Sequence, residues 1–461
     1  MEVMKSNTLF IIIHQYFFGI INKGHERSVR AKKHILGSLV IRGGSILINL
    51  LLVPLTIHYL NPTKYGIWLT LSSIIGWLTF FDIGLGNGLR NRLAEAKARN
   101  DDTLSKILVS TTYALLSIIT FCVFLLFGIV QFFLNWSKIL NAPFEMEHEL
   151  SVLALIVVAF FCLQFVINLI CTVLTADQRP ALVSLINLLS SGLSLGIIYI
   201  IARFSHGSMI LLGLASGASP VIILIISSIF YYSKRYAPVR PGIKYIDFSY
   251  TKDLMSLGIK FFIIQIAAII MFSTSNIILT QLFSPYEVTV YNVAFKYFSI
   301  ITMIFSILIT PYWSAITEAY VKNDHQWINR AMKVQLYLWL GSICISLVLL
   351  LFSNFFYGIW VGKSLKIPIT LSFGVFIYIN LMSLNSVFST FLNGVGKITI
   401  ILIISVLISI LNIPLSIYFS KLFGISGVVI SSSLCLLLGA IVGSIQYKKI
   451  ISFRAIGIWN R

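Results

Sequence analysis

The stretch from Tyr65 to Asp101 reads YGIWLTLSSIIGWLTFFDIGLGNGLRNRLAEAKARND and decides the fold class of the chain. Its first part, residues 66–85, is apolar and long enough to cross the roughly 30 Å hydrocarbon core of a bilayer as a helix. A glycine-rich turn at 84–88 follows, which we interpret as a place where helices pack closely. The remainder is polar and basic. This order is typical of a membrane-spanning helix that ends at a positively charged membrane surface.

The same pattern extends over the rest of the chain. Of its 461 residues, 58% are hydrophobic and only 11% are charged, less than half of the roughly 25% found in soluble domains. Apolar segments of spanning length recur at 36–57, 66–85, 107–130, 151–174, 181–202, 209–232, 254–282, 290–313, 331–352, 367–391, 398–419 and 424–446. The sequence therefore predicts an all-α polytopic membrane protein of about twelve transmembrane helices.

The positive charge is unevenly divided between the two sides of the predicted membrane. The chain carries 34 Lys and Arg against 15 Asp and Glu, a net charge of +19. If the N-terminus is cytoplasmic, the connecting segments on that side hold about four times as many Lys and Arg as the outer loops, in agreement with the positive-inside rule. Both termini are therefore predicted to be cytoplasmic. The same distribution argues against binding of nucleic acid.

The two halves of the chain share an internal repeat at an offset of 223 residues. The matches are Leu60-Asn61-Pro62 with Phe283-Ser284-Pro285, Glu95-Ala96 with Glu318-Ala319, and Arg99-Asn100-Asp101 with Lys322-Asn323-Asp324. Matches this short also arise by chance. Because six helices separate the copies, the repeat predicts two six-helix lobes in the same orientation, related by a pseudo-two-fold axis along the membrane normal, with a central cavity between them.

This repeat divides the chain into five expected parts. They are an N-terminal cytoplasmic or interfacial extension (1–33), an N-lobe (34–232), a cytoplasmic linker (233–253), a C-lobe (254–446) and a cytoplasmic tail (447–461). We expect the linker to let the two lobes rock against each other.

Three basic residues lie inside predicted helices, where a charge is costly unless it faces a cavity or a partner. They are Arg42, Lys260 and Lys296. Polar residues at helical spacing accompany each of them, and we expect these to line the same cavity: Asn49, Gln265, Asn276 and Asn292. Snorkelling of the two lysines to the headgroups is the alternative interpretation. Cations inside the membrane-spanning segments favour a polyvalent anion as the cargo.

Carboxylates are nearly absent from the predicted helices, and Asp82 at the inner end of the second helix is the exception. We interpret it as a structural partner of Arg90 or Arg92, in preference to a proton relay. A cation-coupled drug antiporter would need an intramembrane acid. The acidic loop 131–150, with Glu145, Glu147, His148 and Glu149, is interpreted as solvated in preference to a weak metal site. We expect no catalytic residue, metal or cofactor.

The run Phe81-Asp82-Ile83-Gly84-Leu85-Gly86-Asn87-Gly88-Leu89-Arg90-Asn91 carries a family resemblance. With the rest of Tyr65–Asp101, it resembles the second helix and the following cytoplasmic helix of Wzx-type O-antigen or polysaccharide repeat-unit flippases. These belong to the multidrug/oligosaccharidyl-lipid/polysaccharide exporter superfamily. The twelve-helix layout is similar from about residue 34 onward.

The resemblance implies a flippase, not an enzyme, in the bacterial inner membrane. It would move undecaprenyl-diphosphate-linked oligosaccharide from the inner to the outer leaflet, for O-antigen or capsule assembly. Membrane lipids, a polysaccharide polymerase and a chain-length regulator are the implied partners. In the expected alternating-access mechanism, Arg42 and Lys260 receive the diphosphate and Lys296 stabilises it in the outward-facing state. A cation-coupled multidrug antiporter of the same fold, or a membrane glycosyl polymerase from a different class, are the alternatives.

Overall fold

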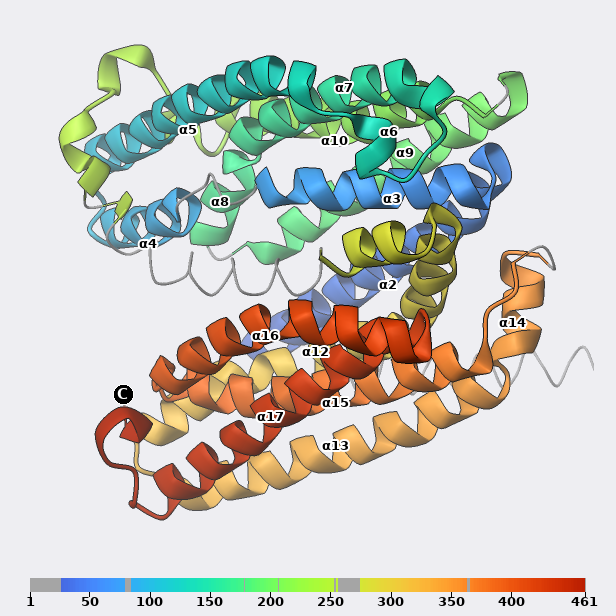
Figure 1. The fold of residues 1–461 in the computed structure, drawn as a ribbon. Coiled ribbons are helices and arrows are strands. Elements are labelled where there is room, and N and C mark those ends of the chain that lie inside the picture. Colours follow the sequence, from blue (N-terminus) through green and yellow to red (C-terminus); the bar gives the residue numbers. More distant parts are fainter. Residues whose placement is uncertain are drawn as a thin grey trace, which may run out of the picture.

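A computed structural model describes residues 26–78, 84–177, 179–205, 207–252, 254–255, 274–362 and 365–460. These residues form helices joined by turns, and none of them belongs to a β-strand. Two helical bundles lie one above the other in Figure 1, with α2, α3 and α12 between them.

The helices of the upper bundle, the N-lobe, are α2 (Glu26–Leu60), α3 (Pro62–Gly76), α4 (Leu85–Ala98), α5 (Asp102–Val130), α6 (Trp136–Ile139), α7 (Glu147–Ile167), α8 (Leu169–Ala176), α9 (Pro180–Phe204) and α10 (Met209–Ser233). Those of the lower bundle, the C-lobe, are α12 (Pro285–Val321), α13 (His325–Leu351), α14 (Ser353–Trp360), α15 (Ile369–Gly394), α16 (Thr399–Phe423) and α17 (Ser426–Ile451). Residues 274–282 are helical as well and precede α12.

Within the described ranges, ten helices are long and apolar enough to cross a membrane. They correspond to ten of the twelve predicted spans, and the other two, 66–85 and 254–282, are only partly described. The predicted all-α membrane fold is therefore confirmed. Two helices differ clearly from their predicted spans, and the first is α2, which begins at Glu26 and not at residue 36. The helix predicted at 290–313 runs from Pro285 to Val321, because proline fits the first turn of a helix, where its missing N–H is not needed.

The sequence repeat is also a repeat of local structure. Asn100 and Asn323 both have a positive φ, 55° and 58°, which asparagine tolerates better than most residues. Asp101 and Asp324 follow them, and each carboxylate accepts a hydrogen bond from a backbone N–H three residues later, at 2.8 Å and 2.9 Å. These are N-caps, and they start α5 and α13 in the same way. The third predicted span of each lobe thus begins identically, which supports the two-lobed repeat.

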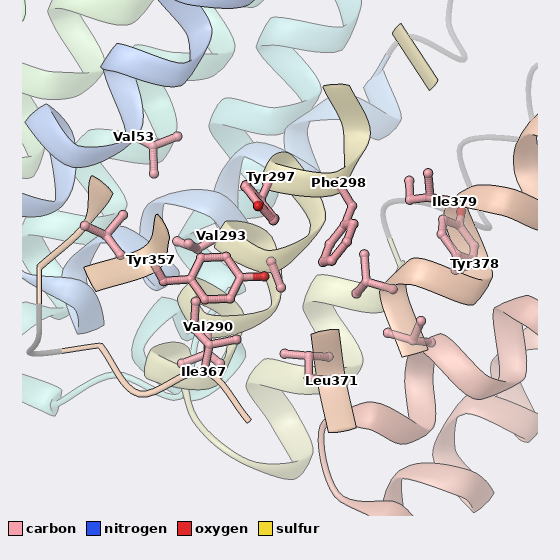
Figure 2. Close-up of a cluster of buried hydrophobic side chains, with 14 of the residues drawn as sticks. Val53, Val290, Val293, Tyr297, Phe298, Tyr357, Ile367, Leu371, Tyr378 and Ile379 are labelled. Atoms are coloured by element: carbon pink, nitrogen blue, oxygen red, sulfur yellow. The ribbon is translucent and has the colours of Figure 1, made fainter. Parts of the chain in front are cut away.

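A buried hydrophobic cluster lies at the boundary between the lobes (Figure 2). Val53 of α2 belongs to it together with Val290 and Val293 of α12, Tyr357 of α14 and Leu371 of α15. Lipid tails are as apolar as these side chains, so burial alone does not hold the lobes together in a membrane. Close packing must supply the attraction, and the cluster therefore provides an interface that can separate at modest cost.

The segment after α10 is bound to the N-lobe. The backbone N–H of Gly242 donates to Ser110 Oγ at 3.1 Å, and that of Asp247 donates to Thr111 Oγ1 at 3.0 Å. The Lys106 ammonium lies 4.0 Å from the centre of the Tyr245 ring. The described part of the predicted linker thus lies along the first turns of α5. This part of the linker is therefore fixed to the N-lobe.

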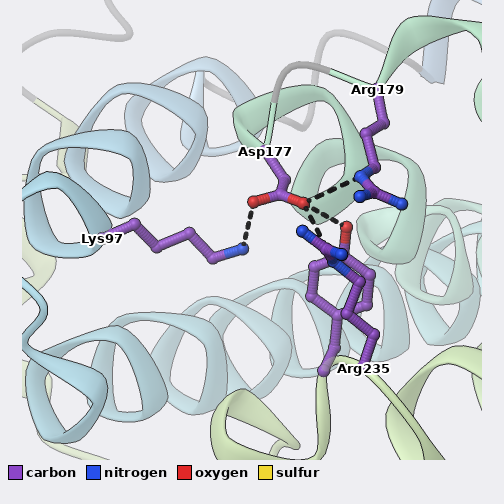
Figure 3. A network of polar contacts seen from close by, with 5 residues as sticks. Lys97, Asp177, Arg179 and Arg235 are labelled. Carbon is purple, nitrogen blue, oxygen red and sulfur yellow. Dashed lines mark hydrogen bonds and ion pairs between the residues drawn. The ribbon is translucent and has the colours of Figure 1, made fainter.

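Asp177, in the turn between α8 and α9, fixes the beginning of this segment (Figure 3). Its carboxylate accepts a hydrogen bond from the Tyr236 hydroxyl at 2.6 Å and pairs with Lys97 of α4 at 2.9 Å. Arg179 and Arg235 approach it at 3.2 Å and 3.6 Å. One carboxylate therefore joins α4, the α8–α9 turn and the linker.

The protonation of Asp177 decides how strongly this network holds. Burial raises the pKa of the carboxyl, but the hydrogen bonds from Tyr236 and Lys97 and the positive charges of Lys97 and Arg235 outweigh it, so that the pKa is lowered. A carboxylate with a lowered pKa stabilises the folded state at neutral pH, and this contribution disappears as the pH falls through the folded-state value. The network is therefore fully formed at physiological pH.

Substitution Asp177→Asn should release the linker. It leaves the basic side chains around position 177 without their counter-charge, and losing such contacts costs about 1–3 kcal/mol. Limited proteolysis of the purified full chain should then show trypsin cleaving after Lys244 about tenfold faster. Glu95→Gln is the matched control, because its ion pair with Arg92 is largely solvent-exposed. Equal cleavage of the two variants would show that Asp177 does not hold the linker.

Candidate functional site

The two lobes meet where α2 turns into α3 and where residues 283–285 lead into α12, and we call this the closed end. Here α3 of the N-lobe packs on α12 of the C-lobe. A Cβ at Gly66 would lie 1.6 Å from the carbonyl oxygen of Pro285, so only glycine permits this backbone approach. Thr289 Oγ1 also donates to the carbonyl of Pro62 at 2.6 Å. The closed end is thus joined by a close backbone approach and by a hydrogen bond from a side chain to the backbone.

A ladder of neutral polar side chains continues this contact. Thr70 Oγ1 of α3 lies 2.6 Å from Thr280 Oγ1, and both residues are fully buried. Asn276 Nδ2 donates to Ser73 Oγ at 2.7 Å and its Oδ1 accepts from Asn292 Nδ2 of α12 at 2.8 Å. Uncharged groups can exchange such bonds for bonds to water, which makes the ladder a contact that is able to open.

Lys296 is a cation at this boundary. It lies on the same face of α12 as Asn292, about 17 Å along the helix from Pro285. Its ammonium donates to the Tyr65 hydroxyl of α3 at 3.1 Å and lies 5.8 Å from the centre of that ring. No carboxylate among the described residues pairs with it. The half-buried charge is therefore held by a neutral group and is able to attract an anion.

A short element of the N-lobe covers the closed end from outside. Gln281 Nε2 donates to the carbonyls of Lys138 and Ile139 in α6, at 3.1 Å and 2.6 Å. Asn141 Nδ2 in turn donates to the carbonyl of Thr280 at 3.0 Å. The acidic loop thus has a structural role, because Glu147 accepts the backbone N–H groups of Trp136 and Ser137 and so caps α6.

Away from the closed end the polar faces of α2 and α12 are exposed. The side chains concerned are Asn49 of α2 and Ser306 and Thr310 of α12. Each of them donates a hydrogen bond to a carbonyl of its own helix. Polar faces of membrane-spanning helices are expected to border water or cargo and not lipid. The lobes therefore touch at the closed end and leave polar surface uncovered towards the other end.

The structure brings together three of the predicted site residues, Asn276, Asn292 and Lys296. The Asn49 amide, by contrast, bonds the Ser45 carbonyl of its own helix at 2.8 Å and makes no contact with this group. Arg90 is exposed on α4.

The remaining predicted residues are not placed by the structure. Three of them lie outside the described residues: Lys260, Gln265 and Asp82. The predicted pairing of Asp82 with Arg90 is therefore not tested. Position 42 belongs to α2, but the Arg42 side chain lies outside the described part of the chain.

Four residues of this contact were not predicted from the sequence: Tyr65, Thr70, Ser73 and Asn141. Thr70 and Ser73 also bond carbonyls of their own helix, at 3.0 Å and 2.9 Å. Hydroxyls in membrane helices commonly do this, so their presence in an apolar segment did not distinguish an inter-lobe contact from a local one. The spacing of Thr70 and Ser73, three residues apart on one face of α3, was the available signal.

The comparisons of this chain with known proteins agree on one family. A family model described as "Polysaccharide biosynthesis protein" matches residues 32–317. A "Putative O-antigen transporter" of Salmonella typhimurium is 23% identical over 412 residues, covering 86% of this chain and 90% of that protein. A protein of the same name from Salmonella typhi is 25% identical over 315 residues, covering 66% and 69%.

Solved structures show the same fold. An inward-facing multidrug resistance MATE family transporter of the MOP superfamily aligns with a TM-score of 0.75 at 16% identity, over 91% of this chain and 98% of that one. The outward-facing conformation of such a transporter gives 0.67 at 16% identity, over 92% and 96%.

Substitution Gly66→Ala should open the closed end. The new methyl group would strike the Pro285 backbone, and overpacking of this kind costs about 1–3 kcal/mol. A reporter cysteine in place of buried Thr280, in a chain without its five native cysteines, should then react with a maleimide about tenfold faster. Gly76→Ala on the same helix is the control, because nothing lies within 4 Å of its added Cβ. Unchanged labelling would mean that the approach at Gly66 does not hold the lobes together.

Proposed function

We propose that this chain, which belongs to the polysaccharide biosynthesis protein family, is a Wzx-type flippase of the bacterial inner membrane. Its cargo would be a polyprenyl-diphosphate-linked oligosaccharide repeat unit, moved from the inner to the outer leaflet for assembly of O-antigen or another surface polysaccharide. The family match and the relatives named as O-antigen transporters support transport in polysaccharide biosynthesis. The two-lobed fold supports alternating access as its mechanism.

Lys296 is the observation that carries the proposal. A cation in a membrane-spanning helix is costly and is retained where it serves a partner. Among the described residues, its ammonium donates a hydrogen bond to the Tyr65 hydroxyl alone, so an arriving diphosphate would replace a neutral partner with a doubly charged one. Phosphate oxygens form stronger, charge-assisted hydrogen bonds with an ammonium. The lysine is thus suited to an anionic cargo.

The proposed cycle begins from the conformation described here. With the closed end on the outer side, as the distribution of Lys and Arg predicts, the exposed polar faces of α2 and α12 open towards the cytoplasm. Arg42 and Lys260 would receive the diphosphate there. The anion would then draw Lys296 away from Tyr65, weaken the closed end and favour its opening. An inside-negative potential drives anions outward by about 2.3 kcal/mol per charge per 100 mV.

A multidrug antiporter of the same fold is the second candidate, because the aligned structures come from such transporters. The acids of the described spans lie near helix ends, Glu287 in the first turn of α12 among them, so these spans give it little chemical support. Glu147 caps α6 and Glu149 accepts the Met209 backbone N–H, so both acids have structural partners. An increase in sensitivity to cationic dyes on deletion of the gene, with normal surface polysaccharide, would favour this candidate.

Replacement of Lys296 tests the anion role. Lys296→Gln removes the charge but keeps a neutral hydrogen-bond donor, and the loss of one charge-assisted contact should lower transport about 10- to 100-fold. Lys296→Arg should retain more activity than Lys296→Gln. The measurement is leaflet-resolved detection of lipid-linked oligosaccharide in cells that express only the variant. Lys421→Gln, an exposed lysine at the end of α16, should transport normally. Full transport by Lys296→Gln would remove Lys296 from the cargo site.

A disulfide across the closed end tests alternating access. Thr70→Cys and Thr280→Cys together should form a disulfide on oxidation, because the hydroxyls they replace are 2.6 Å apart. The cross-link would fix the lobes at this end, so cargo should accumulate in the inner leaflet and transport should resume after reduction. Each single variant, oxidised in the same way, should remain active. Normal transport by the cross-linked protein would contradict opening at this end.

A further inference from the structure

Each lobe ends in a short segment that folds back against its own helices. The first is the linker segment, residues 234–250 after α10, and the second is the tail segment, residues 452–460 after α17. They occupy the same place in the repeat, because each follows the sixth predicted span of its lobe. Figure 1 shows both at the end of the molecule opposite α14 and the closed end, the linker segment in yellow-green and the tail segment in dark red beside the C-terminus.

The linker segment lies at the depth where the apolar part of α5 begins. Its backbone N–H groups at Gly242 and Asp247 donate to Ser110 and Thr111. The predicted apolar span of this helix is 107–130, so these two residues lie about 5 Å inside it at 1.5 Å per residue. The hydrocarbon core takes up only about 20 residues of a span, and the ends of the span lie among the lipid headgroups. The linker segment is therefore level with the headgroups.

The tail segment is fixed at a corresponding depth in the C-lobe. Gln446, the last residue of its predicted span, donates from Nε2 to the Trp459 carbonyl at 3.2 Å. The Lys449 ammonium lies 3.8 Å from the centre of the Trp459 ring. Lys397, just before the eleventh predicted span, donates to Asn460 Oδ1. The tail segment is thus level with the ends of two apolar spans.

Large apolar side chains are exposed on both segments. In the linker segment Ile243 is 88% exposed and Phe248 is 53% exposed, and in the tail segment Phe453 is 76% and Ile456 is 78% exposed. Because the backbone of each segment is bonded to its own lobe, these side chains lie on the outside of that lobe. At headgroup depth they are positioned to enter the adjoining acyl region, as the apolar side chains of interfacial segments do.

The same parts of the chain are strongly basic. Residues 234–252 carry five Lys and Arg against one acid, Asp247, and residues 447–461 carry four and no acid. The Asp247 carboxylate accepts the backbone N–H of a neighbouring residue. Arg240 and Lys244 are exposed, and no carboxylate in the described part of the chain forms an ion pair with either of them. Cations at this depth are complementary to the phosphate groups of anionic lipids.

We propose that the linker segment and the tail segment are interfacial anchors, one on each lobe, that bind anionic lipids of the cytoplasmic leaflet. Their apolar side chains enter the upper acyl region and their cations hold lipid phosphate groups. A soluble protein is a poorer partner, because lipid already covers a surface at headgroup depth. The inference needs only the membrane fold and the predicted orientation, so it holds whatever cargo the protein carries.

Lipid-quenching measurements on the full chain test the assignment. In the chain without its five native cysteines, a bimane label is attached at Ile243→Cys or Phe453→Cys, and the protein is placed in phosphatidylcholine nanodiscs. Brominated phosphatidylglycerol, which is anionic, is titrated in, and brominated phosphatidylcholine is titrated in a parallel series. We expect quenching of both labels, with phosphatidylglycerol reaching half of its effect at an about fivefold lower mole fraction. A label at Gln326→Cys, exposed in the first turn of α13, should stay unquenched.

The cations are tested separately from the apolar side chains. Arg240→Gln with Lys244→Gln should remove the fivefold preference at position 243 and keep the quenching by brominated phosphatidylcholine, because the apolar side chains are unchanged. Lys366→Gln with Lys421→Gln is the matched control. It removes the same charge from exposed lysines that are predicted on the opposite side of the membrane, and it should keep the preference.

Two results would overturn the proposal. Absence of quenching at positions 243 and 453 would show that both segments face water and are open to a protein partner. Equal quenching by the two lipids in the labelled parent chain, or a preference that survives the loss of both linker cations, would show that these segments do not select anionic lipid.

Discussion

A bilayer offers polar side chains no hydrogen-bonding solvent, and this constraint governs how the two lobes touch. Each polar group between them must find its partner in its own helix, in the opposite lobe or in a water-filled space. At the closed end the partners are protein: Thr70 with Thr280, Ser73 with Asn276, and Tyr65 with Lys296. Towards the other end, Ser306 and Thr310 are exposed. The position along the helices where polar groups stop pairing across the lobes and become exposed therefore defines the conformation.

The choice of groups at the closed end keeps the energetic difference between conformations small. Hydrogen bonds between neutral side chains in membranes contribute on average about 0.6 kcal/mol each, so the ladder can be exchanged for water without a large penalty. The backbone approach at Gly66 depends on shape alone, and an apolar interface gains little over lipid. A cargo with modest differential affinity is then sufficient to shift the equilibrium between the two states.

The sequence predicts the helices of this protein well because hydrophobic length is a local property. It also predicts the repeat, since asparagine and aspartate act through their own backbone at Asn100–Asp101 and Asn323–Asp324. Partners across the boundary between the lobes are harder to predict from the sequence. Lys296 stands out as a charge in an apolar segment. Nothing in the sequence distinguishes Thr70 from any other hydroxyl that bonds to a carbonyl of its own helix. The packing of the linker on α5 depends on backbone groups, such as the Gly242 N–H, that carry no signal in the sequence.

The diphosphate is common to every lipid-linked repeat unit, and in the proposed function its partners are cations on helices that also carry the contact between the lobes. The Lys296 ammonium bonds to Tyr65 of the opposite lobe, so altering Lys296 would disturb both cargo binding and the closed end. Activity and conformation must therefore be measured together for any variant at this position.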